Sequence, residues 1–206
     1  MTLPQSHFRD LYDRSPDPWR ISVGWYERRK RALALAALPR ERFRRVFEPG
    51  CGNGELTAQL ALRADEVIAW DGVERAVLTC RARLGAAPAA GRVDVRAATV
   101  PDEWPDGEFD LVVLSELGYY LDADDLDAVL RRTVAGLEPD GVLLAVHWRH
   151  PAPGYPRTGD EVHAAIADVA GLHPLASYRD EDFALDVLVR GPAAPQSVAR
   201  AQGVIA

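Results

Sequence analysis

Cysteine is scarce in this chain of 206 residues, which contains only Cys51 and Cys80. Two cysteines form at most one disulfide, so the sequence excludes a disulfide framework, and without a C-x-x-C pair or a His/Cys cluster it gives no signal of a zinc site. No apolar run approaches the ~18 residues of a membrane span. The N-terminal stretch MTLPQSHFRDLYDRSPDPW is too polar for a signal peptide. We therefore expect a cytoplasmic protein with no metal and no membrane partner.

Positive charge is also in deficit, because 24 Lys and Arg residues face 31 Asp and Glu residues and the formal net charge is −7. An acidic protein repels the phosphate backbone, which disfavours nucleic acid as a partner. One basic stretch comprises Arg28, Arg29, Lys30, Arg31, Arg40, Arg42, Arg44 and Arg45. It could hold an anionic substrate, but runs of charge usually belong to solvated helix faces and loops, and we favour that interpretation. The expected partner is a small molecule.

The composition that remains, 48% hydrophobic and 27% charged, is typical of one globular domain with an appendage. The predicted N-terminal helical appendage covers residues 1–44. Its pattern predicts helices over 4–14 and 25–37, separated by the segment SPDP at 15–18, because proline removes a donor and restricts the residue before it. The tail at 191–206, rich in alanine, proline and glutamine, is predicted to be loose.

Residues 45–190 alternate short apolar runs with helical patterns. Strands are predicted at 45–49, 66–71, 93–98, 109–115, 141–148, 174–178 and 184–189, and helices at 55–63, 74–84, 123–136 and 160–170. This alternation predicts an α/β fold, a doubly wound sheet of mainly parallel strands with helices on both faces. The last two strands are separated by too few residues for a helical crossover, so this pair should be antiparallel.

The most informative segment is EPGCGNG at 48–54, between the first strand and the next helix. Glycine permits positive φ and close approach of a ligand, and cofactors bind at such strand ends. The spacing differs from the G-x-G-x-x-G of dinucleotide sites. A carboxylate at Glu48 would repel a pyrophosphate but attract an ammonium, which favours the amino-acid end of S-adenosylmethionine. Asp71 follows Gly50 by 21 residues, a spacing that suits an acid that binds a ribose.

Several segments resemble the motifs of a known family. FEPGCGNG, VIAWD and FDLVVLSELGYYL are similar to motifs of the class I S-adenosylmethionine-dependent methyltransferases, and the similarity extends over residues 45–190. The resemblance implies a Rossmann-like methyltransferase sheet with strand order 3-2-1-4-5-7-6 and an antiparallel last strand. It also implies S-adenosylmethionine as cofactor and S-adenosylhomocysteine as product.

A narrower resemblance spans nearly the whole chain. DPWRISVGWYERRK, EPGCGNGELTAQLA, VPDEWPDGEFDLVVLSELGYYL and VHWRHP…GDEVH are similar to the nodulation protein S family, whose best-known type methylates the free amine of a de-N-acetylated chitooligosaccharide. This implies methyl transfer to an amine nitrogen of a small molecule, such as an amino sugar or a natural-product intermediate. A small-molecule O-methyltransferase of secondary metabolism and a non-catalytic cofactor-binding regulatory protein are the alternatives.

The resemblance also implies a set of cofactor-binding residues. Glu48 and the glycine turn would cradle the methionine part, Asp71 would hold the ribose, and the residues after the third strand, which lack the family's usual acid, would line the adenine. Two aromatic residues before the sheet would close over the cofactor, since aromatic faces attract cations, or would instead pin the N-terminal helices to the core. The expected set is Trp19, Tyr26, Glu48, Gly50, Cys51, Gly52, Gly54, Asp71, Gly72, Thr99, Val100 and Ser115.

Three residues are candidates for the chemistry. A sulfonium is already activated, so the enzyme mainly aligns donor and acceptor, but an amine must lose a proton before it attacks. Glu116, after an apolar strand, is placed to bind or deprotonate an amine, or else to cap a loop. His147, at the end of another strand, is a candidate base or a structural histidine. Of Tyr119 and Tyr120, one should pack in the core and the other, taken as Tyr120, should line the site.

Overall fold

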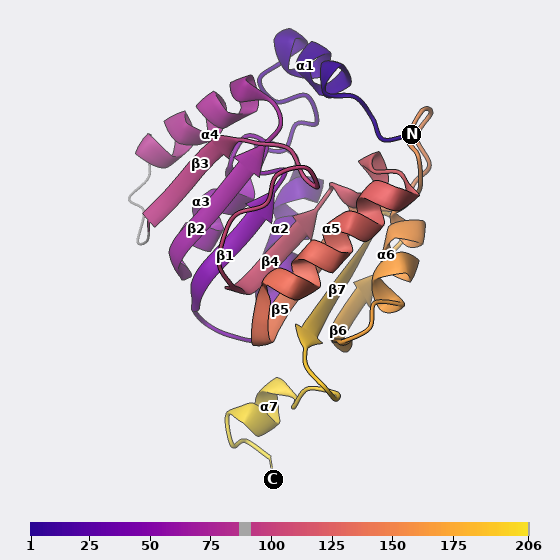
Figure 1. The fold of residues 1–206 in the computed structure, drawn as a ribbon. Coiled ribbons are helices and arrows are strands. Elements are labelled where there is room, and N and C mark those ends of the chain that lie inside the picture. Colours follow the sequence, from indigo (N-terminus) through magenta and orange to yellow (C-terminus); the bar gives the residue numbers. More distant parts are fainter. Residues whose placement is uncertain (87–91, 206) are drawn as a thin grey trace.

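The computed structural model describes residues 1–86 and 92–205, and one seven-stranded sheet organises them (Figure 1). The strand order is β3-β2-β1-β4-β5-β7-β6, and β7 runs antiparallel to both of its neighbours while the other pairs are parallel. The strands are β1 (Phe43–Pro49), β2 (Ala64–Asp71), β3 (Arg92–Ala97), β4 (Phe109–Ser115), β5 (Leu137–Trp148), β6 (Leu172–Arg179) and β7 (Phe183–Arg190). The predicted fold class, strand order and antiparallel last strand are confirmed. The predicted domain at 45–190 includes residues 87–91, which lie outside the described residues.

The predicted helices are all present. They are α1 (Gln5–Arg14), α2 (Trp25–Ala37), α3 (Glu55–Ala61), α4 (Glu74–Ala86), α5 (Ala123–Gly136) and α6 (Gly159–Ala167). The structure adds two short elements that were not predicted, the 3-10 helix η1 (Gly118–Tyr120) and α7 (Val198–Ala201) in the tail. Figure 1 shows α7 at the end of the molecule opposite α1. β5 starts earlier than predicted because Leu137 pairs with Phe109 across a shift in register.

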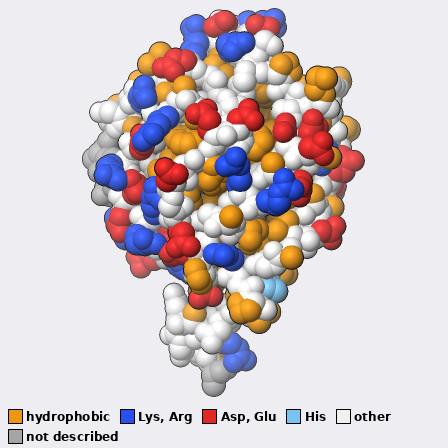
Figure 2. Space-filling model, viewed as in Figure 1, with side chains coloured by type: hydrophobic (Ala, Val, Ile, Leu, Met, Phe, Trp, Pro, Cys, Tyr) orange, Lys and Arg blue, Asp and Glu red, His pale blue; other side chains and the backbone are white. Residues whose placement is uncertain are grey.

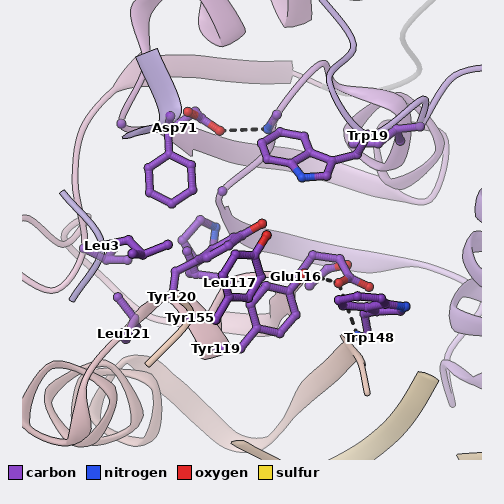
Figure 3. Close-up of a pocket in the computed structure, with 18 of the residues that line it drawn as sticks. Leu3, Trp19, Asp71, Glu116, Leu117, Tyr119, Tyr120, Leu121, Trp148 and Tyr155 are labelled. Carbon is purple, nitrogen blue, oxygen red and sulfur yellow. Dashed lines mark hydrogen bonds between the residues drawn. The ribbon is translucent and has the colours of Figure 1, made fainter. Parts of the chain in front are cut away.

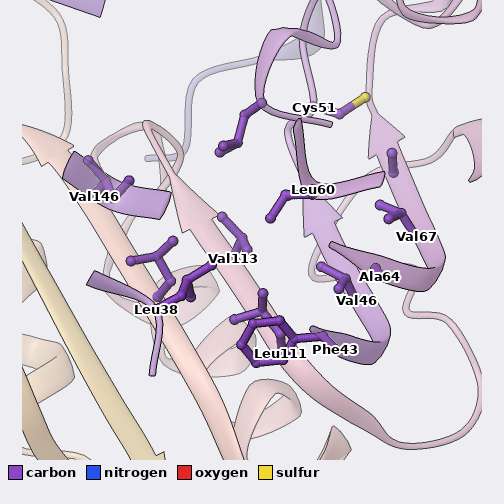
Figure 4. Close-up of a cluster of buried hydrophobic side chains, with 14 of the residues drawn as sticks. Leu38, Phe43, Val46, Cys51, Leu60, Ala64, Val67, Leu111, Val113 and Val146 are labelled. Atoms are coloured by element: carbon purple, nitrogen blue, oxygen red, sulfur yellow. The ribbon is translucent and has the colours of Figure 1, made fainter. Parts of the chain in front are cut away.

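Side chains of the central strands alternate between two buried layers. Leu111 and Val113 of β4 pack in the layer covered by α2, α3 and α4, where Figure 4 shows them with Leu60 of α3. Val112 and Leu114 point to the opposite layer, which α5 and α6 cover. A strand buried on both faces reads as a continuous apolar run, which explains the sequence FDLVVL. The carboxyl ends of the parallel strands are thereby held rigidly at one edge.

Residues 1–24 pass over that edge and are bonded at both of its ends. The N–H of Leu3 donates to the carbonyl of Tyr120 in η1 at 2.9 Å. At the other end, Oδ1 of Asp17 accepts a hydrogen bond from the side chain of Asn53, in the glycine turn, at 3.2 Å. Between these attachments α1 lies above the strand ends, as Figure 1 shows. The N-terminal segment is therefore a fixed roof over the edge where ligands bind in such sheets.

Replacement of Gly54 by alanine should destabilise the fold strongly. Gly54 has φ +79°, and a Cβ there would lie 2.6 Å from Sγ of Cys80 and 3.1 Å from its Cα. We expect a loss of about 3 kcal/mol in the free energy of unfolding, part from the left-handed backbone and part from overpacking. The control is Gly154→Ala, which has φ +85° but no atom within 4 Å of the new Cβ. It should cost only about 1 kcal/mol, from backbone strain alone. Equal losses for the two variants in denaturant titrations would contradict the packing role of Gly54.

Candidate active site

A cavity of about 500 Å³ lies beneath α1 at the carboxyl ends of β1, β2, β4 and β5 (Figure 3). Its walls include many of the residues predicted from the sequence. These are Trp19, Tyr26, Gly50, Gly52, Asp71, Gly72, Thr99, Val100, Ser115, Glu116 and Tyr120. A smaller pocket of about 80 Å³ shares part of this wall and adds Glu48 and Cys51. Gly54 and His147 line neither space.

The glycine turn forms one wall by presenting backbone. Gly50 and Gly52 have φ of +76° and +55°, a region that L side chains rarely adopt. The N–H of Gly50 donates to the carbonyl of Trp70 at 2.7 Å, so the turn is tied to the end of β2. A Cβ on Gly52 would lie 3.3 Å from the hydroxyl of Tyr12, on the roof helix. Gly54 is required for packing instead, since a Cβ at this position would clash with Cys80 of α4.

Asp71 joins the turn to the next helix. Its Oδ2 accepts from the N–H of Gly52 at 3.0 Å and its Oδ1 from the N–H of Val73 at 2.9 Å. Burial raises the pKa of Asp71 to about 6, although both hydrogen bonds oppose this shift. The carboxyl group lines the large cavity next to Gly72. It can therefore accept hydrogen bonds from a polar ligand such as a pair of ribose hydroxyls.

The small pocket combines a buried acid with a buried guanidinium. Glu48 is buried, accepts a hydrogen bond from Oγ1 of Thr57 at 2.7 Å, and has a pKa raised by burial to about 8. Arg31 of α2 is also buried, and its Nε has no hydrogen-bond partner within the described part of the chain. Its Nη1 donates to the carbonyl of Ile21 at 2.8 Å and its Nη2 lies 3.7 Å from Oε2 of Glu55, so the Nε is the donor left to bind the carboxylate of an amino acid, beside an acid that can accept from its ammonium.

The basic stretch of the sequence divides in the structure. Arg28 and Arg42 are exposed, as the solvated interpretation predicts, but for Lys30 and Arg31 that interpretation is wrong because both side chains are buried. Lys30 Nζ lies 3.0 Å from Oε1 of Glu27 and 2.7 Å from Oε1 of Glu116, and the two carboxylates raise the pKa of this lysine despite its burial. Figure 2 shows basic and acidic side chains intermixed over the face in view.

Glu116 is the most heavily bonded carboxylate of the cavity. Besides Lys30, it accepts hydrogen bonds from the hydroxyl of Tyr119 and, at 3.2 Å, from the N–H of Trp148, both at Oε2. Its φ of +55° is uncommon for a residue with a side chain and turns the carboxylate toward these donors. Glu116 therefore lies in the cavity as predicted, with both of its oxygens occupied by donors from α2, η1 and β5.

Aromatic rings form the wall opposite the glycine turn. Tyr119 stacks on Tyr155 with ring centroids 5.4 Å apart, and Tyr120 packs edge-on against Phe8 of α1 at 4.8 Å. Figure 3 shows this group between Trp19 and Asp71 at one end and Trp148 and Glu116 at the other. The structure places both tyrosines of the pair at the cavity, whereas the sequence predicted only one there.

His147 occupies a different place from the one expected of a base. Its side chain is fully buried behind η1, and its Nε2 accepts from the N–H of Gly118 at 3.1 Å. Its Nδ1 lies 3.2 Å from Nε2 of His163, which contacts Asp186 through its other nitrogen. Burial holds the pKa of His147 well below its usual range. The bonding pattern assigns the proton to Nδ1 and gives His147 a structural position, supporting the backbone that precedes Tyr119.

Residues 1–86 and 92–205 contain no group of three or more His, Cys, Asp or Glu side chains arranged to hold a metal ion. In the same ranges, no helix is both long and apolar enough to cross a membrane. Cys51 and Cys80 are free and buried.

Known proteins with similar sequences and folds are methyltransferases. A family model described as "Methyltransferase domain" matches residues 46–141. The structure of a putative methyltransferase from Pseudomonas syringae is 49% identical, with a TM-score of 0.69 over 81% of this chain and 100% of that chain. N-methyltransferase NodS from Bradyrhizobium japonicum WM9, in complex with S-adenosylhomocysteine, is 23% identical and shares the fold, with a TM-score of 0.79 over 92% of this chain and 98% of that one.

Curated relatives are longer than this chain. Trans-aconitate 2-methyltransferase of Mycobacterium tuberculosis (strain ATCC 25177 / H37Ra) is 33% identical over 154 residues, which is 74% of this chain and 53% of that protein. The chain thus spans about half the length of the curated relatives it matches.

Glu48→Gln should change how stability depends on pH. The pKa of Glu48 rises from 4.5 to about 8 on folding, so its protonated form stabilises the fold fully below pH 4.5, and this contribution is lost as the pH rises through about 8. We expect the difference in free energy of unfolding, wild type minus variant, to fall by a few kcal/mol over that range, since each pH unit between the two pKa values contributes about 1.4 kcal/mol. Denaturant titrations at several pH values measure it, with the exposed Glu41→Gln as control. If the difference in free energy of unfolding between wild type and Glu48→Gln stays constant with pH, the pKa of Glu48 is not raised by burial.

Proposed function

The chain belongs to the class I S-adenosylmethionine-dependent methyltransferases, as its motifs predict, and on this premise we propose that it transfers a methyl group to the nitrogen of a small-molecule amine. The observation that carries the choice of acceptor is the group formed by Glu27, Lys30 and Glu116, which places two carboxylates and one ammonium at one end of the cavity. This end carries a net negative charge.

The residues present also fit S-adenosylmethionine, whose methionine part would occupy the small pocket that adjoins this group, with the ribose and the adenine in the large cavity. Asp71 would accept from the ribose hydroxyls, with Thr99 and Val100 against the adenine. In the small pocket, Glu48 would face the ammonium of the methionine part and Arg31 its carboxylate, since the Nε of Arg31 is buried and unpaired. When bound, the cofactor supplies a methyl group on a positively charged sulfur, which needs alignment more than activation.

The charge at the acceptor end favours nitrogen over oxygen. When a neutral amine takes the methyl group, positive charge moves from sulfur to nitrogen, and nearby carboxylates stabilise that charge as it develops. A phenolate or carboxylate acceptor would bring negative charge toward Glu27 and Glu116, which would repel it. Only one basic residue, Lys30, is among the cavity walls within the described residues, and both acids already neutralise it. An anionic acceptor such as the one named for the curated relatives therefore fits this wall poorly.

The roles within the site follow from the contacts. Glu116 would act as a support that fixes Lys30 and the hydroxyl of Tyr119, rather than as a free base. Tyr120 would line the acceptor space, and Ser115 would lie at the strand end between cofactor and acceptor. Trp19 would contact the ligands from the N-terminal segment and Tyr26 from the first turn of α2, since both line the cavity. The intact glycine turn and Asp71 argue against a regulatory protein that has lost catalysis.

Binding of two ligands should separate the two ends of the cofactor site. S-adenosylhomocysteine contains the amino-acid part and 5′-methylthioadenosine lacks it. Arg31→Met should lower the affinity for S-adenosylhomocysteine by about 10- to 100-fold, the loss expected for a charge-assisted hydrogen bond. It should leave the affinity for methylthioadenosine nearly unchanged. Asp71→Ala should weaken both ligands, by about 10-fold or more. Calorimetric titration measures the dissociation constants of both ligands for the wild type and the two variants, with circular dichroism to confirm folding. Equal losses of both ligands in Arg31→Met would remove Arg31 from the carboxylate site.

Methyl transfer to matched acceptors tests the proposed reaction. Methyl-labelled S-adenosylmethionine is incubated with the protein and with amines, alcohols, phenols and carboxylic acids that share the same carbon skeletons. We expect label in amines at rates at least about 10-fold above those of the oxygen acceptors, because carboxylates stabilise the ammonium that forms. Label that enters phenols or carboxylic acids instead would establish an O-methyltransferase and reject the proposal.

A further inference from the structure

The carboxylate of Glu27 has one oxygen that the rest of the site does not use. Glu27 lies in the first turn of α2, and its side chain, 15% exposed, lines both the cavity and the small pocket. Its Oε1 accepts from Lys30 at 3.0 Å. Its Oε2 has no hydrogen-bond partner among residues 1–86 and 92–205. An acceptor atom therefore remains available at the cavity wall.

Glu116 differs from Glu27 in this respect. Its Oε1 accepts from Lys30 and its Oε2 accepts from both Tyr119 and the backbone of Trp148. These donors come from three elements, so the position of Glu116 is fixed and its capacity is largely filled. One ammonium, that of Lys30, bridges the two carboxylates, which places the free oxygen of Glu27 close to the strand end where the acceptor is expected. Of the two acids, Glu27 is the one that can still bind a cation.

Beyond Lys30 and Glu116, the cavity that Glu27 lines has many apolar and aromatic residues. The ring of Tyr26 lies over Lys30 at 4.8 Å, and its buried hydroxyl has no partner within the described part of the chain. Leu117, Tyr119 and Tyr155 continue the wall. Burial raises the pKa of Glu27, so its carboxylate is poorly solvated and gains more from a bound cation than a surface acid would. Aromatic faces attract the same cation.

We propose that Glu27 recognises the acceptor, by pairing its free oxygen with the protonated nitrogen of a small amine whose apolar or aromatic body lies against the tyrosine wall, and that this oxygen takes up the proton that the nitrogen must lose before it attacks the methyl group. This rests on the proposed function and narrows its substrate class. An amino sugar would bring several hydroxyl groups to a wall of rings and leucines, where partners such as the free hydroxyl of Tyr26 would replace only part of their hydrogen bonds to water. A compact amine with a hydrocarbon or aromatic body has no hydroxyl groups and therefore loses no such hydrogen bonds.

Binding to the full-length chain saturated with S-adenosylhomocysteine tests this without turnover. The probes are benzylamine, which is protonated at neutral pH, its neutral counterpart benzyl alcohol, and glucosamine. We expect benzylamine to bind about 10-fold or more tightly than either of the others, since a charge-assisted hydrogen bond adds to the contact with the rings. Glu27→Gln should abolish the preference over benzyl alcohol, measured at a concentration of S-adenosylhomocysteine that saturates the variant. Glu41→Gln, the same change at an exposed position, should keep the preference.

A second variant guards against a general loss of structure. Glu27→Asp keeps the charge and should retain part of the preference for benzylamine. If Glu27→Gln binds benzylamine as the wild type does, or if glucosamine binds more tightly than benzylamine, the proposal is overturned. Wild-type protein that binds S-adenosylhomocysteine but shows no preference for benzylamine over benzyl alcohol also overturns it and leaves the methyltransferase function standing. Folded wild-type protein that fails to bind S-adenosylhomocysteine would overturn the proposed function itself.

Discussion

The buried ammonium of Lys30 is the interaction on which the acceptor end of this site depends. A charge removed from water must be paired, and Lys30 pairs with Glu27 on its own helix and with Glu116 at the end of β4. These ion pairs fix α2 to the sheet. Glu116 then holds the hydroxyl of Tyr119 and the backbone of Trp148, so η1 and β5 take their places around the same carboxylate. Loss of one member would leave a buried charge without its partner.

Helix α2 also connects the two ends of the cavity. Arg31 and Lys30 both line the small pocket beside the glycine turn, and Lys30 also lines the large cavity, where it pairs with Glu116. The segment that precedes α2 is bonded through Asp17 to Asn53, and the chain begins with Leu3 bonded to Tyr120. One continuous stretch of chain therefore contacts the glycine turn, η1 and the carboxylate of Glu116. Such a segment can fix the distance between donor and acceptor, which is the main requirement of methyl transfer from a sulfonium.

His147 and Lys30 both lie in places that the sequence patterns did not indicate, and the cause is the same, namely the direction in which each side chain points. His147 follows Val146 on β5, and neighbouring residues of a strand face opposite layers, so His147 faces α6 and meets His163 instead of a ligand. A run of charged residues predicts solvated side chains, and Lys30 stands in such a run. Its spacing of four from Tyr26 and from Ala34 was the signal that it lies on the buried stripe of the helix. Nothing local, however, marks Glu116 as its partner.

The sequence alone determined the sheet, because strand–helix alternation and the short last connection are local properties. It also determined the position of the glycine turn and of Asp71, because a strand end, a turn and the acid of the next strand keep a fixed spacing in this fold. The tertiary structure alone decided which charges are buried and how they pair. Glu27 and Glu116 are far apart in the chain, and only the packing of α2 on the sheet brings them to one ammonium. The positions of the glycine turn and of Asp71 could therefore be predicted from spacing, whereas the pairing of the buried charges depends on long-range contacts that no spacing encodes.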